Sequence, residues 1–358
     1  MYCYLGITFS LSGSFKTAQN LLRQKALRAY FGLKSEIDLY SISKFAVLKL
    51  LDSLILPVVS YGIEVWVSGT FGFKALANMT CNGEQKNLTN MANDQIEKLH
   101  LAILKWTLGV GKATSNAGIW GDCGSTPLVV RYVKQITDFF NRLAKMDQEN
   151  SKAIVRHAFA EQKSLGLGWF STVTNTLDSL DMNKLECQSY NSLLCQERAR
   201  NRFIMMWEVE RKGNRKLTFY NDIKKKFETE HYLKIPSRSG GSCIAKFRMS
   251  AHKLKVETGR YGERSWNPIH RLCEFCTDLD TMELLINLPG IDPIVEDEIH
   301  LLRTCPRYHQ IRTNVQEPTK SVLFHDTSSL FELEHIMEMT KYLREVFKIR
   351  FPAKRRKT

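Results

Sequence analysis

The chain has 358 residues, 43% hydrophobic and 25% charged, an ordinary composition for a globular protein with two or three domains and a substantial core. Its net charge of +14 favours a polyanionic partner, with nucleic acid the first to consider, although a generally basic protein has the same charge. Nine mostly scattered cysteines, an odd number, argue against a disulfide scaffold and for a reducing compartment.

The first segment alternates apolar with small or polar residues over positions 2–11, which predicts β-structure followed by a turn at 12–14. A start this close to a strand suggests a piece of a longer protein, and no secretory signal is expected after Met1. Residues 15–34 then have apolar residues at helical spacing. The other face of this helix includes Arg23 and Arg28 and is either solvated or in contact with phosphates.

The most apolar stretch covers residues 43–67. Lys49, Asp52 and Glu64 interrupt it, so it does not meet the requirement of about 20 apolar residues for a membrane span. We expect a buried core helix that is kinked or restarted at Pro57. Residues 68–92 are rich in Gly, Asn and Thr and are predicted to form a loop or insert.

A second amphipathic helix is predicted over residues 93–109, where glycines end it. Further on, Thr126 is expected to cap a helix that has Pro127 at its first position. Residues 150–235 continue as mainly helical, and residues 236–242 are predicted to be a linker or flexible loop. One more helix is expected over 328–350.

Positive charge is concentrated in residues 201–260, which hold 15 Lys or Arg and 6 Asp or Glu and so carry +9 of the net charge. Within this window Lys224, Lys225 and Lys226 lie beside aromatic residues. They are candidates for phosphate contacts next to stacked bases, or they form the solvated face of a helix whose aromatic residues are buried. The basic tail at 354–357 is a nuclear-import signal, a phosphate contact or a frayed terminus. We expect a protein of the nucleus and cytoplasm, and only this tail suggests a bias toward the nucleus.

A candidate metal site is formed by Cys273, Cys276, His300 and Cys305, in the pattern C-x2-C-x23-H-x4-C. A closed Cys3His set is typical of structural zinc, and the alternative is three buried thiols beside a core histidine. The spacing from His300 to Cys305 exceeds one helical turn. Because Pro306 disfavours the α conformation at Cys305, we expect a short helix that carries His300 and unwinds at Thr304.

The insert between Cys276 and His300 is acidic and contains no Lys or Arg. Its carboxylates either support the His300 imidazole as hydrogen-bond partners of a metal ligand or belong to a solvated loop. The acidic residues are Asp278, Asp280, Glu283, Asp292, Glu296, Asp297 and Glu298.

Several segments of the chain, taken in their order along the sequence, resemble the C-terminal half of the reverse transcriptase of non-LTR (LINE-type) retrotransposons. Tyr4, Leu5 and Gly6 with the basic helix after them are similar to the primer-grip hairpin and the start of the thumb, and residues 56–66 are similar to the thumb signature. Residues 120–128 resemble a downstream helical segment, and 217–233, 245–248, 257–261 and the Cys/His run resemble the zinc-knuckle region. The long x23 insert and residues 68–92 depart from the family.

The resemblance implies a mainly α fold with a short N-terminal β-hairpin, a thumb-like helical bundle, further helices and a small C-terminal zinc knuckle. The implied regions are a primer grip and thumb (1–67), an insert (68–92), a helical connection (93–235), a zinc-knuckle module (236–320), and a terminal helix with a basic tail (321–358).

The implied function is nucleic-acid binding by a fragment of an RNA-directed DNA polymerase. The residues expected to contact nucleic acid are Tyr4, Leu5, Gly6, Arg23, Arg28 and Lys224–Lys226. The expected cofactor is a structural Zn²⁺, and the expected partners are RNA or DNA and an upstream palm portion of the same polyprotein. No membrane association is expected. Polymerisation requires palm carboxylates that hold two metal ions. In the family these lie upstream in an aromatic-x-Asp-Asp motif, and the chain contains no Asp-Asp pair, so we expect it to be inactive alone.

Two other functions are alternatives to this one. A zinc-binding adaptor recruited by the host would use the same helices to hold a protein partner, through exposed apolar surface. A free-standing hydrolase or transferase is the weakest alternative, because no nucleophile–base pair, Walker A loop or other catalytic motif is visible in the sequence.

Overall fold

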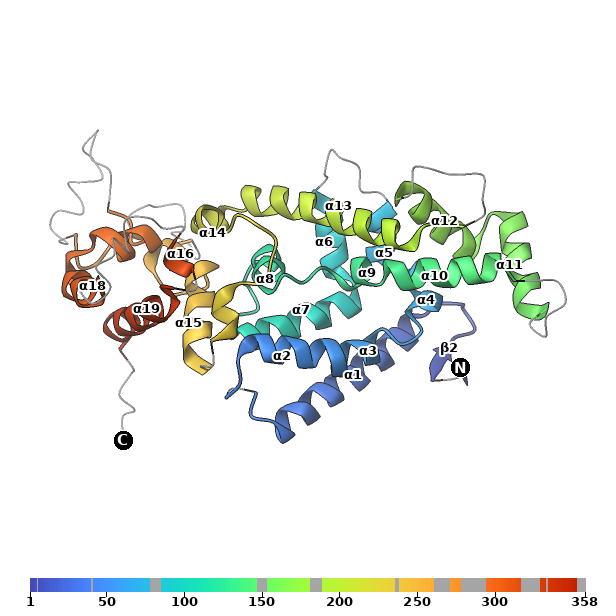
Figure 1. Cartoon of the computed structure of the whole chain (residues 1–358), viewed down its shortest axis with the longest axis horizontal. Coiled ribbons are helices and arrows are strands. Elements are labelled where there is room, and N and C mark those ends of the chain that lie inside the picture. Colours follow the sequence, from blue (N-terminus) through green and yellow to red (C-terminus); the bar gives the residue numbers. More distant parts are fainter. Residues whose placement is uncertain are drawn as a thin grey trace. The chain divides into compact units, whose positions relative to one another are not determined.

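The structure, a computed structural model, is mainly helical with a single short β-hairpin among the residues it describes, which confirms the predicted fold class (Figure 1). The described residues are 1–4, 6–39, 41–77, 85–146, 153–180, 189–235, 238–260, 271–277, 294–316, 329–332 and 334–352. They divide into two compact units. The first comprises Met1–Asp38, Leu48–Leu104 and Gly124–Gly213, and the second Leu39–Val47, Lys105–Cys123 and Asn214–Thr358.

The N-terminal hairpin pairs β1 (Tyr2–Tyr4) with β2 (Ile7–Phe9) in antiparallel register. The strands are shorter than the predicted run, because the chain already reverses at Gly6. Its φ of +82° is one that glycine adopts without steric cost.

The helix predicted over residues 15–34 is present as α1 (Lys16–Glu36). The apolar stretch forms a series of short helices, and its part from Leu51 to Val59 packs on α1 in the first unit. A π-helical turn, Leu51–Ile55, follows α2 (Lys44–Leu50), and α3 (Leu56–Val59) begins anew with Pro57 in its first turn. The predicted restart at Pro57 is therefore confirmed. Gly62, at φ +65°, then starts α4 (Ile63–Trp66), whose Trp66 is buried.

Residues 68–92 are not a simple loop, so the loop alternative for this segment was wrong, while its interpretation as an insert stays a prediction. They contain α5 (Phe71–Ala77) and most of α6 (Gln85–Asn93), which pack on each other. Phe73, Leu76 and Met91 are buried, and this packing outweighs the loop-like composition. Residues 78–84 lie outside the described residues.

The predicted helix at 93–109 is present as α7 (Gln95–Leu108). Thr126, however, does not cap the next helix, because α9 (Leu128–Arg131) begins with Pro127 as its N-cap. The Leu128 amide instead donates to Glu97 Oε2 of α7 at 2.8 Å, a buried carboxylate that suits the positive end of a helix.

Long helices complete the first unit: α10 (Val133–Ala144), α11 (Ala153–Leu165), α12 (Gly168–Leu180) and α13 (Ser192–Gly213). α10 and α13 lie side by side (Figure 1). Phe203 and Trp207 of α13 are fully buried, and the Arg211 guanidinium lies 4.9 Å from the Trp207 ring. The aromatic residues of this basic helix are therefore in the core.

The second unit is built from α8 (Asn116–Cys123), α14 (Thr218–Ile223), α15 (Arg238–Arg248), α16 (Lys255–Thr258), α18 (His309–Gln316) and α19 (Ile336–Arg350). α15 begins inside the predicted linker, so the flexible-loop prediction for 236–242 was wrong from Arg238 onward. α19 supplies the expected terminal helix and packs on α15 and α18.

Among the described helices, none is long and apolar enough by itself to cross a membrane. The bent pair Lys44–Val59 and Ile63–Gly69, at 56°, meets the length and composition test together.

Candidate metal centre

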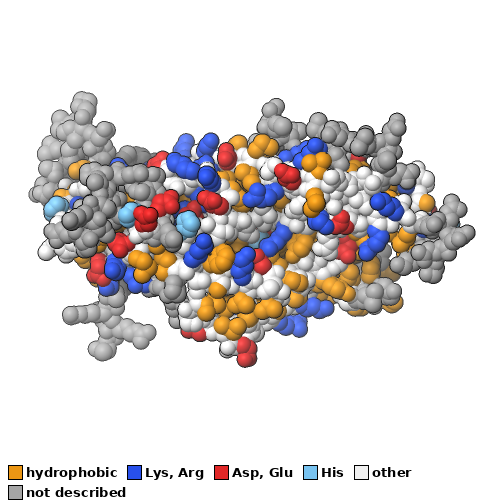
Figure 2. Space-filling model, in the orientation of Figure 1, with side chains coloured by type: hydrophobic (Ala, Val, Ile, Leu, Met, Phe, Trp, Pro, Cys, Tyr) orange, Lys and Arg blue, Asp and Glu red, His pale blue; other side chains and the backbone are white. Residues whose placement is uncertain are grey.

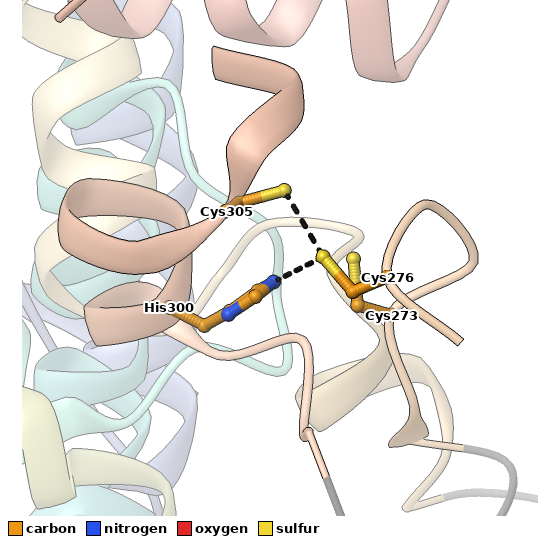
Figure 3. A group of neighbouring side chains, drawn as sticks. All are labelled: Cys273, Cys276, His300 and Cys305. Carbon is orange, nitrogen blue, oxygen red and sulfur yellow. Dashed lines mark hydrogen bonds between the residues drawn. The ribbon is translucent and has the colours of Figure 1, made fainter. Parts of the chain in front are cut away.

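Cys273, Cys276, His300 and Cys305 converge in the second unit, and this group could hold a metal ion (Figure 3). One ligand atom from each lies within 4.8 Å of all the others. Cys276 Sγ is 3.4 Å from His300 Nε2 and 3.7 Å from Cys305 Sγ. Cys273, His300 and Cys305 are buried and Cys276 is half-buried, so these four side chains face one another rather than solvent.

The first two cysteines are brought together by a tight turn. The amides of Cys276 and Thr277 donate to the Cys273 carbonyl, at 3.2 and 3.1 Å. An isolated antiparallel bridge between Leu272 and Val295 holds the base of this turn against the segment that leads to His300. The two halves of the motif are thereby joined although residues 278–293 lie outside the described residues.

The last two ligands are linked by a π-helical turn, His300–Thr304. The Cys305 amide donates to the His300 carbonyl at 2.9 Å, and this bond between residues five apart accommodates the x4 spacing. Cys305 itself is extended, with ψ of 117°, and Pro306 follows it. The predicted helix that ends at Thr304 is therefore present, as a wider turn than an α-helix.

The carbonyls of this turn are held by the helices that follow. Tyr342 donates its hydroxyl to the Leu301 carbonyl at 2.6 Å, and Arg312 donates to the Cys305 carbonyl at 2.6 Å. Both side chains are buried, so the peptide around the last ligand is fixed by α18 and α19.

The hydrogen bonds of His300 are local. Its Nδ1 lies 2.8 Å from Thr304 Oγ1, and its amide donates to Asp297 Oδ1 at 2.7 Å. The hydroxyl of Thr304 reaches the His300 carbonyl at 3.5 Å. Thr304 Oγ1 can therefore accept a hydrogen bond from the protonated Nδ1, which leaves Nε2, the nitrogen beside Cys276, as the metal ligand.

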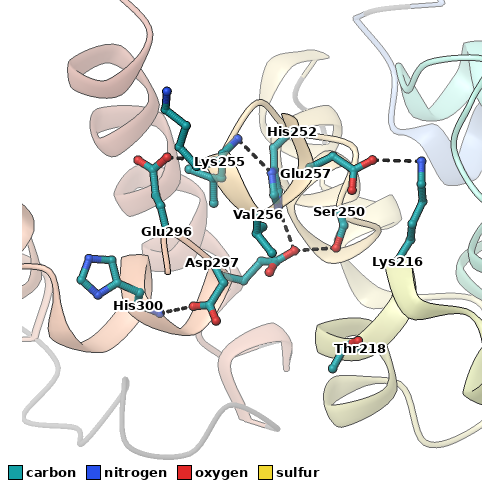
Figure 4. Close-up of polar contacts among 12 residues, drawn as sticks. Lys216, Thr218, Ser250, His252, Lys255, Val256, Glu257, Glu296, Asp297 and His300 are labelled. Carbon is teal, nitrogen blue, oxygen red and sulfur yellow. Dashed lines mark hydrogen bonds and ion pairs between the residues drawn. The ribbon is translucent and has the colours of Figure 1, made fainter. Parts of the chain in front are cut away.

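The neighbouring glutamates have partners other than the imidazole (Figure 4). Glu296 forms a two-pronged pair with Arg350, at 2.5 and 3.0 Å, and also accepts the Lys255 amide. Glu298 contacts His252 at 2.8 Å and Ser250 at 2.5 Å. Both glutamates are buried, so neither is a partner of His300 or part of a solvated loop. Asp278, Asp280, Glu283 and Asp292 lie outside the described residues.

The three thiols differ in acidity. A hydrogen bond with Cys305 and burial raise the pKa of Cys273 to about 12, and burial raises the pKa of Cys276. The hydrogen bond from Cys273 lowers the pKa of Cys305. A cation that binds here must displace the remaining thiol protons, so its affinity should rise with pH.

The residues expected to contact nucleic acid are distributed over both units. In the first, Tyr4 is on β1, Gly6 is in the turn and Leu5 lies outside the described residues. Arg28 is exposed on α1, and Arg23 is half-buried. In the second, Lys225 and Lys226 are exposed after α14.

Lys224 is a correction to that set, because its side chain is only 2% exposed. Its ammonium contacts Glu230 at 2.5 Å and donates to the Glu228 carbonyl at 2.6 Å. The lysine belongs to a buried network around Arg248, which pairs with Asp122 at 3.1 Å and with Glu230 at 2.9 Å. A phosphate would have to displace these carboxylates to reach it.

The structure also brings together Ser125, His100 and Glu97. Ser125 Oγ lies 3.4 Å from His100 Nε2, and His100 Nδ1 lies 3.1 Å from Glu97 Oε1. This is the order of groups in a hydrolase triad. His100 is only 4% exposed, however, and the apolar cavity beside Glu97 is not lined by His100 or Ser125. We therefore interpret the group as a structural link between α7 and the start of α9.

Comparison of the chain with protein-family models, with curated proteins and with solved structures gives no match.

Proposed function

We propose that the chain is a zinc-stabilised, nucleic-acid-binding fragment of a retrotransposon RNA-directed DNA polymerase, with thumb and zinc-knuckle regions. The ordered sequence resemblance supports the family, and the net charge of +14 supports a nucleic-acid partner. The geometry of the Cys3His group supports the metal, and it is the observation on which the proposal chiefly depends.

Zinc fits this group best because of its ligand types and spacing. With Zn–S near 2.3 Å and Zn–N near 2.0–2.1 Å, a tetrahedron has S···S and S···N edges of about 3.8 and 3.6 Å. The corresponding separations from Cys276 are 3.7 Å to Cys305 and 3.4 Å to His300. Four protein ligands fill the tetrahedron, so the ion would stabilise the fold and leave no position for a substrate.

Phosphate contacts would come from several exposed cations rather than from one patch. On the face drawn in Figure 2, Lys and Arg side chains occur in separate groups with Asp and Glu between them. Arg28, Lys225 and Lys226 are exposed and remain candidates. Binding through such contacts weakens steeply with salt, because each contact releases condensed counterions.

The test begins with the full chain purified after nuclease treatment. We expect one Zn²⁺ per chain by elemental analysis, and loss of helical circular dichroism when a chelator removes it. Fluorescence anisotropy with labelled RNA and DNA should show binding, and the logarithm of the association constant should fall linearly with the logarithm of the salt concentration. An affinity independent of salt, or no binding at all, would refute the nucleic-acid proposal.

Two further outcomes separate the alternatives. A protein partner that remains bound after nuclease treatment, together with no affinity for nucleic acid, would favour the adaptor. The isolated chain should not extend a primer on an RNA template, because it contains no Asp-Asp pair, and measurable extension would contradict the proposed division of roles.

A further inference from the structure

Phe275 occupies an unusual position between the two ligands Cys273 and Cys276. Cys273 is 1% exposed, whereas the Phe275 ring is 41% exposed at the outer side of the same tight turn. A single half-exposed apolar side chain is common on protein surfaces and is not by itself a site. The surroundings of this ring are what distinguish it.

One side of the ring rests on a rigid support. The Tyr308 ring meets it edge-on, with centroids 6.2 Å apart and planes at 80°, and Tyr308 is only 1% exposed. The Arg350 guanidinium lies 5.7 Å from the centroid of the Phe275 ring. Arg350 is itself held by Glu296 at 2.5 Å and by Glu274 at 3.2 Å. The ring is therefore positioned before any ligand arrives.

A second cation lies over the same ring. The exposed Arg307, two residues after the ligand Cys305, places its guanidinium over the Phe275 ring, 5.4 Å from the centroid. The charge of Arg350 is offset by two glutamates. In the described part of the chain, by contrast, no carboxylate pairs with Arg307. The exposed Arg307 guanidinium thus adds a positive charge, hydrogen-bond donors and a second flat surface on top of the partly exposed ring.

We propose that Phe275 and Arg307 form a stacking platform for one unpaired base of single-stranded nucleic acid, and this inference rests on the proposed function. Single-strand binding combines aromatic rings, on which bases stack, with cations that contact the backbone phosphates. A base in a duplex has both faces covered by its neighbours and cannot use such a platform. The platform would therefore distinguish single-stranded from double-stranded nucleic acid, but not one base sequence from another.

The test uses the full-length, zinc-loaded chain and a fluorescein-labelled single strand of about 12 nucleotides, within the usual range of single-strand site sizes. The matched duplex serves as the second ligand. We expect Phe275→Ala to weaken single-strand binding by roughly 5- to 150-fold, the range found for one stacked base, with little change for the duplex. Phe275→Trp should retain the affinity, and Arg307→Gln should weaken it and reduce the salt dependence.

Met337→Ala is the control, because Met337 is also half-exposed and lies in the same unit, on α19. Zinc content and circular dichroism show whether each variant folds. Equal effects of Phe275→Ala and Met337→Ala, or equal losses for single strand and duplex, would overturn the platform. If the parent chain binds no nucleic acid, both the proposed function and the platform are refuted. If the parent chain shows salt-dependent binding that Phe275→Ala leaves unchanged, only the platform is refuted.

Discussion

Thr304 Oγ1 lies 2.8 Å from His300 Nδ1, across the π-helical turn that carries both residues. Hydrogen-bond partners of metal-bound histidines fix the ring and its tautomer, and their loss commonly costs 10- to 100-fold in metal affinity. We therefore expect Thr304→Val to weaken zinc binding by roughly tenfold or more, measured by competition with a chromophoric chelator. Thr304→Ser keeps the hydroxyl and should bind like the parent. Equal affinities for the Val and Ser variants would exclude this role for Thr304.

The buried pair of Asp122 and Arg248 predicts a large loss of stability. Both side chains are at most 1% exposed, and Tyr232 also donates to Asp122 Oδ2 at 2.8 Å. Removing one partner of a buried ion pair typically lowers the free energy of unfolding by about 3–5 kcal/mol. Because Arg248 keeps Glu230 as a partner in the variant, we expect Asp122→Asn to lose about 3 kcal/mol, near the lower end of this range. Urea denaturation measures this loss.

The control is Glu345→Gln, which breaks the exposed Lys348–Glu345 pair of α19 in the same unit. Pairs of this kind contribute about 1 kcal/mol or less. If the two variants unfolded at the same urea concentration, the Asp122–Arg248 network would not be a principal source of stability.

Lys44 gives a prediction for alkaline pH. Burial, with a smaller effect of the Lys246 charge, lowers the pKa of its ammonium to about 8, and its Nζ donates to the Thr107 carbonyl at 2.6 Å. Between this value and the ordinary 10.5, the unfolded chain binds more protons than the folded one, so the contribution of Lys44 to stability rises with pH.

We expect Lys44→Met to lose this dependence. The free energy of unfolding of the parent minus that of the variant should therefore increase from pH 8 to 10.5 and be constant below pH 7. A difference that stayed constant over the whole range would show that the folded-state pKa of Lys44 is not lowered.

Close packing of Gly62 against Ile7 of the hairpin leaves no room for a larger residue at position 62. At its φ of +65°, a Cβ atom would lie 2.3 Å from Ile7 Cδ1 of β2. Gly62→Ala should cost about 1–2 kcal/mol from the left-handed backbone, plus the cost of displacing Ile7. Gly13→Ala is the matched control, because Gly13 has φ of +69° and nothing within 4 Å of the added Cβ. Thermal unfolding compares the two, and equal losses would mean that Ile7 moves away freely.

The metal ligands could be predicted from the sequence because their signals are local. The x2 pair forms one tight turn, and the x4 pair spans one π-helical turn. By contrast, the partners of Glu296 and Glu298 lie more than 40 residues away, at Arg350 and His252. No spacing rule connects such positions, so their burial and pairing were not foreseen.

The same limit explains the errors elsewhere. Lys224 has the pattern of a solvated lysine, and its burial depends on how the following segment places Glu230 against it. Thr126 satisfies the local rule for a helix cap, yet the Leu128 amide is taken by Glu97, 31 residues earlier. Helical periodicity correctly predicted the long helices, whereas the structure of the short segments depends on partners that are distant in the sequence.

Each compact unit is assembled from three separated stretches of the chain. During synthesis, Leu39–Val47 and Lys105–Cys123 leave the ribosome well before Asn214, where the remainder of their unit begins. At common elongation rates the interval after Cys123 is roughly 5–20 s, much longer than a hydrophobic segment takes to collapse. Through that interval the apolar helix α8 lacks its later partners Tyr220, Tyr232 and Arg248, and the metal ligands emerge later still. No single proteolytic cut can therefore release the second unit as one continuous fragment.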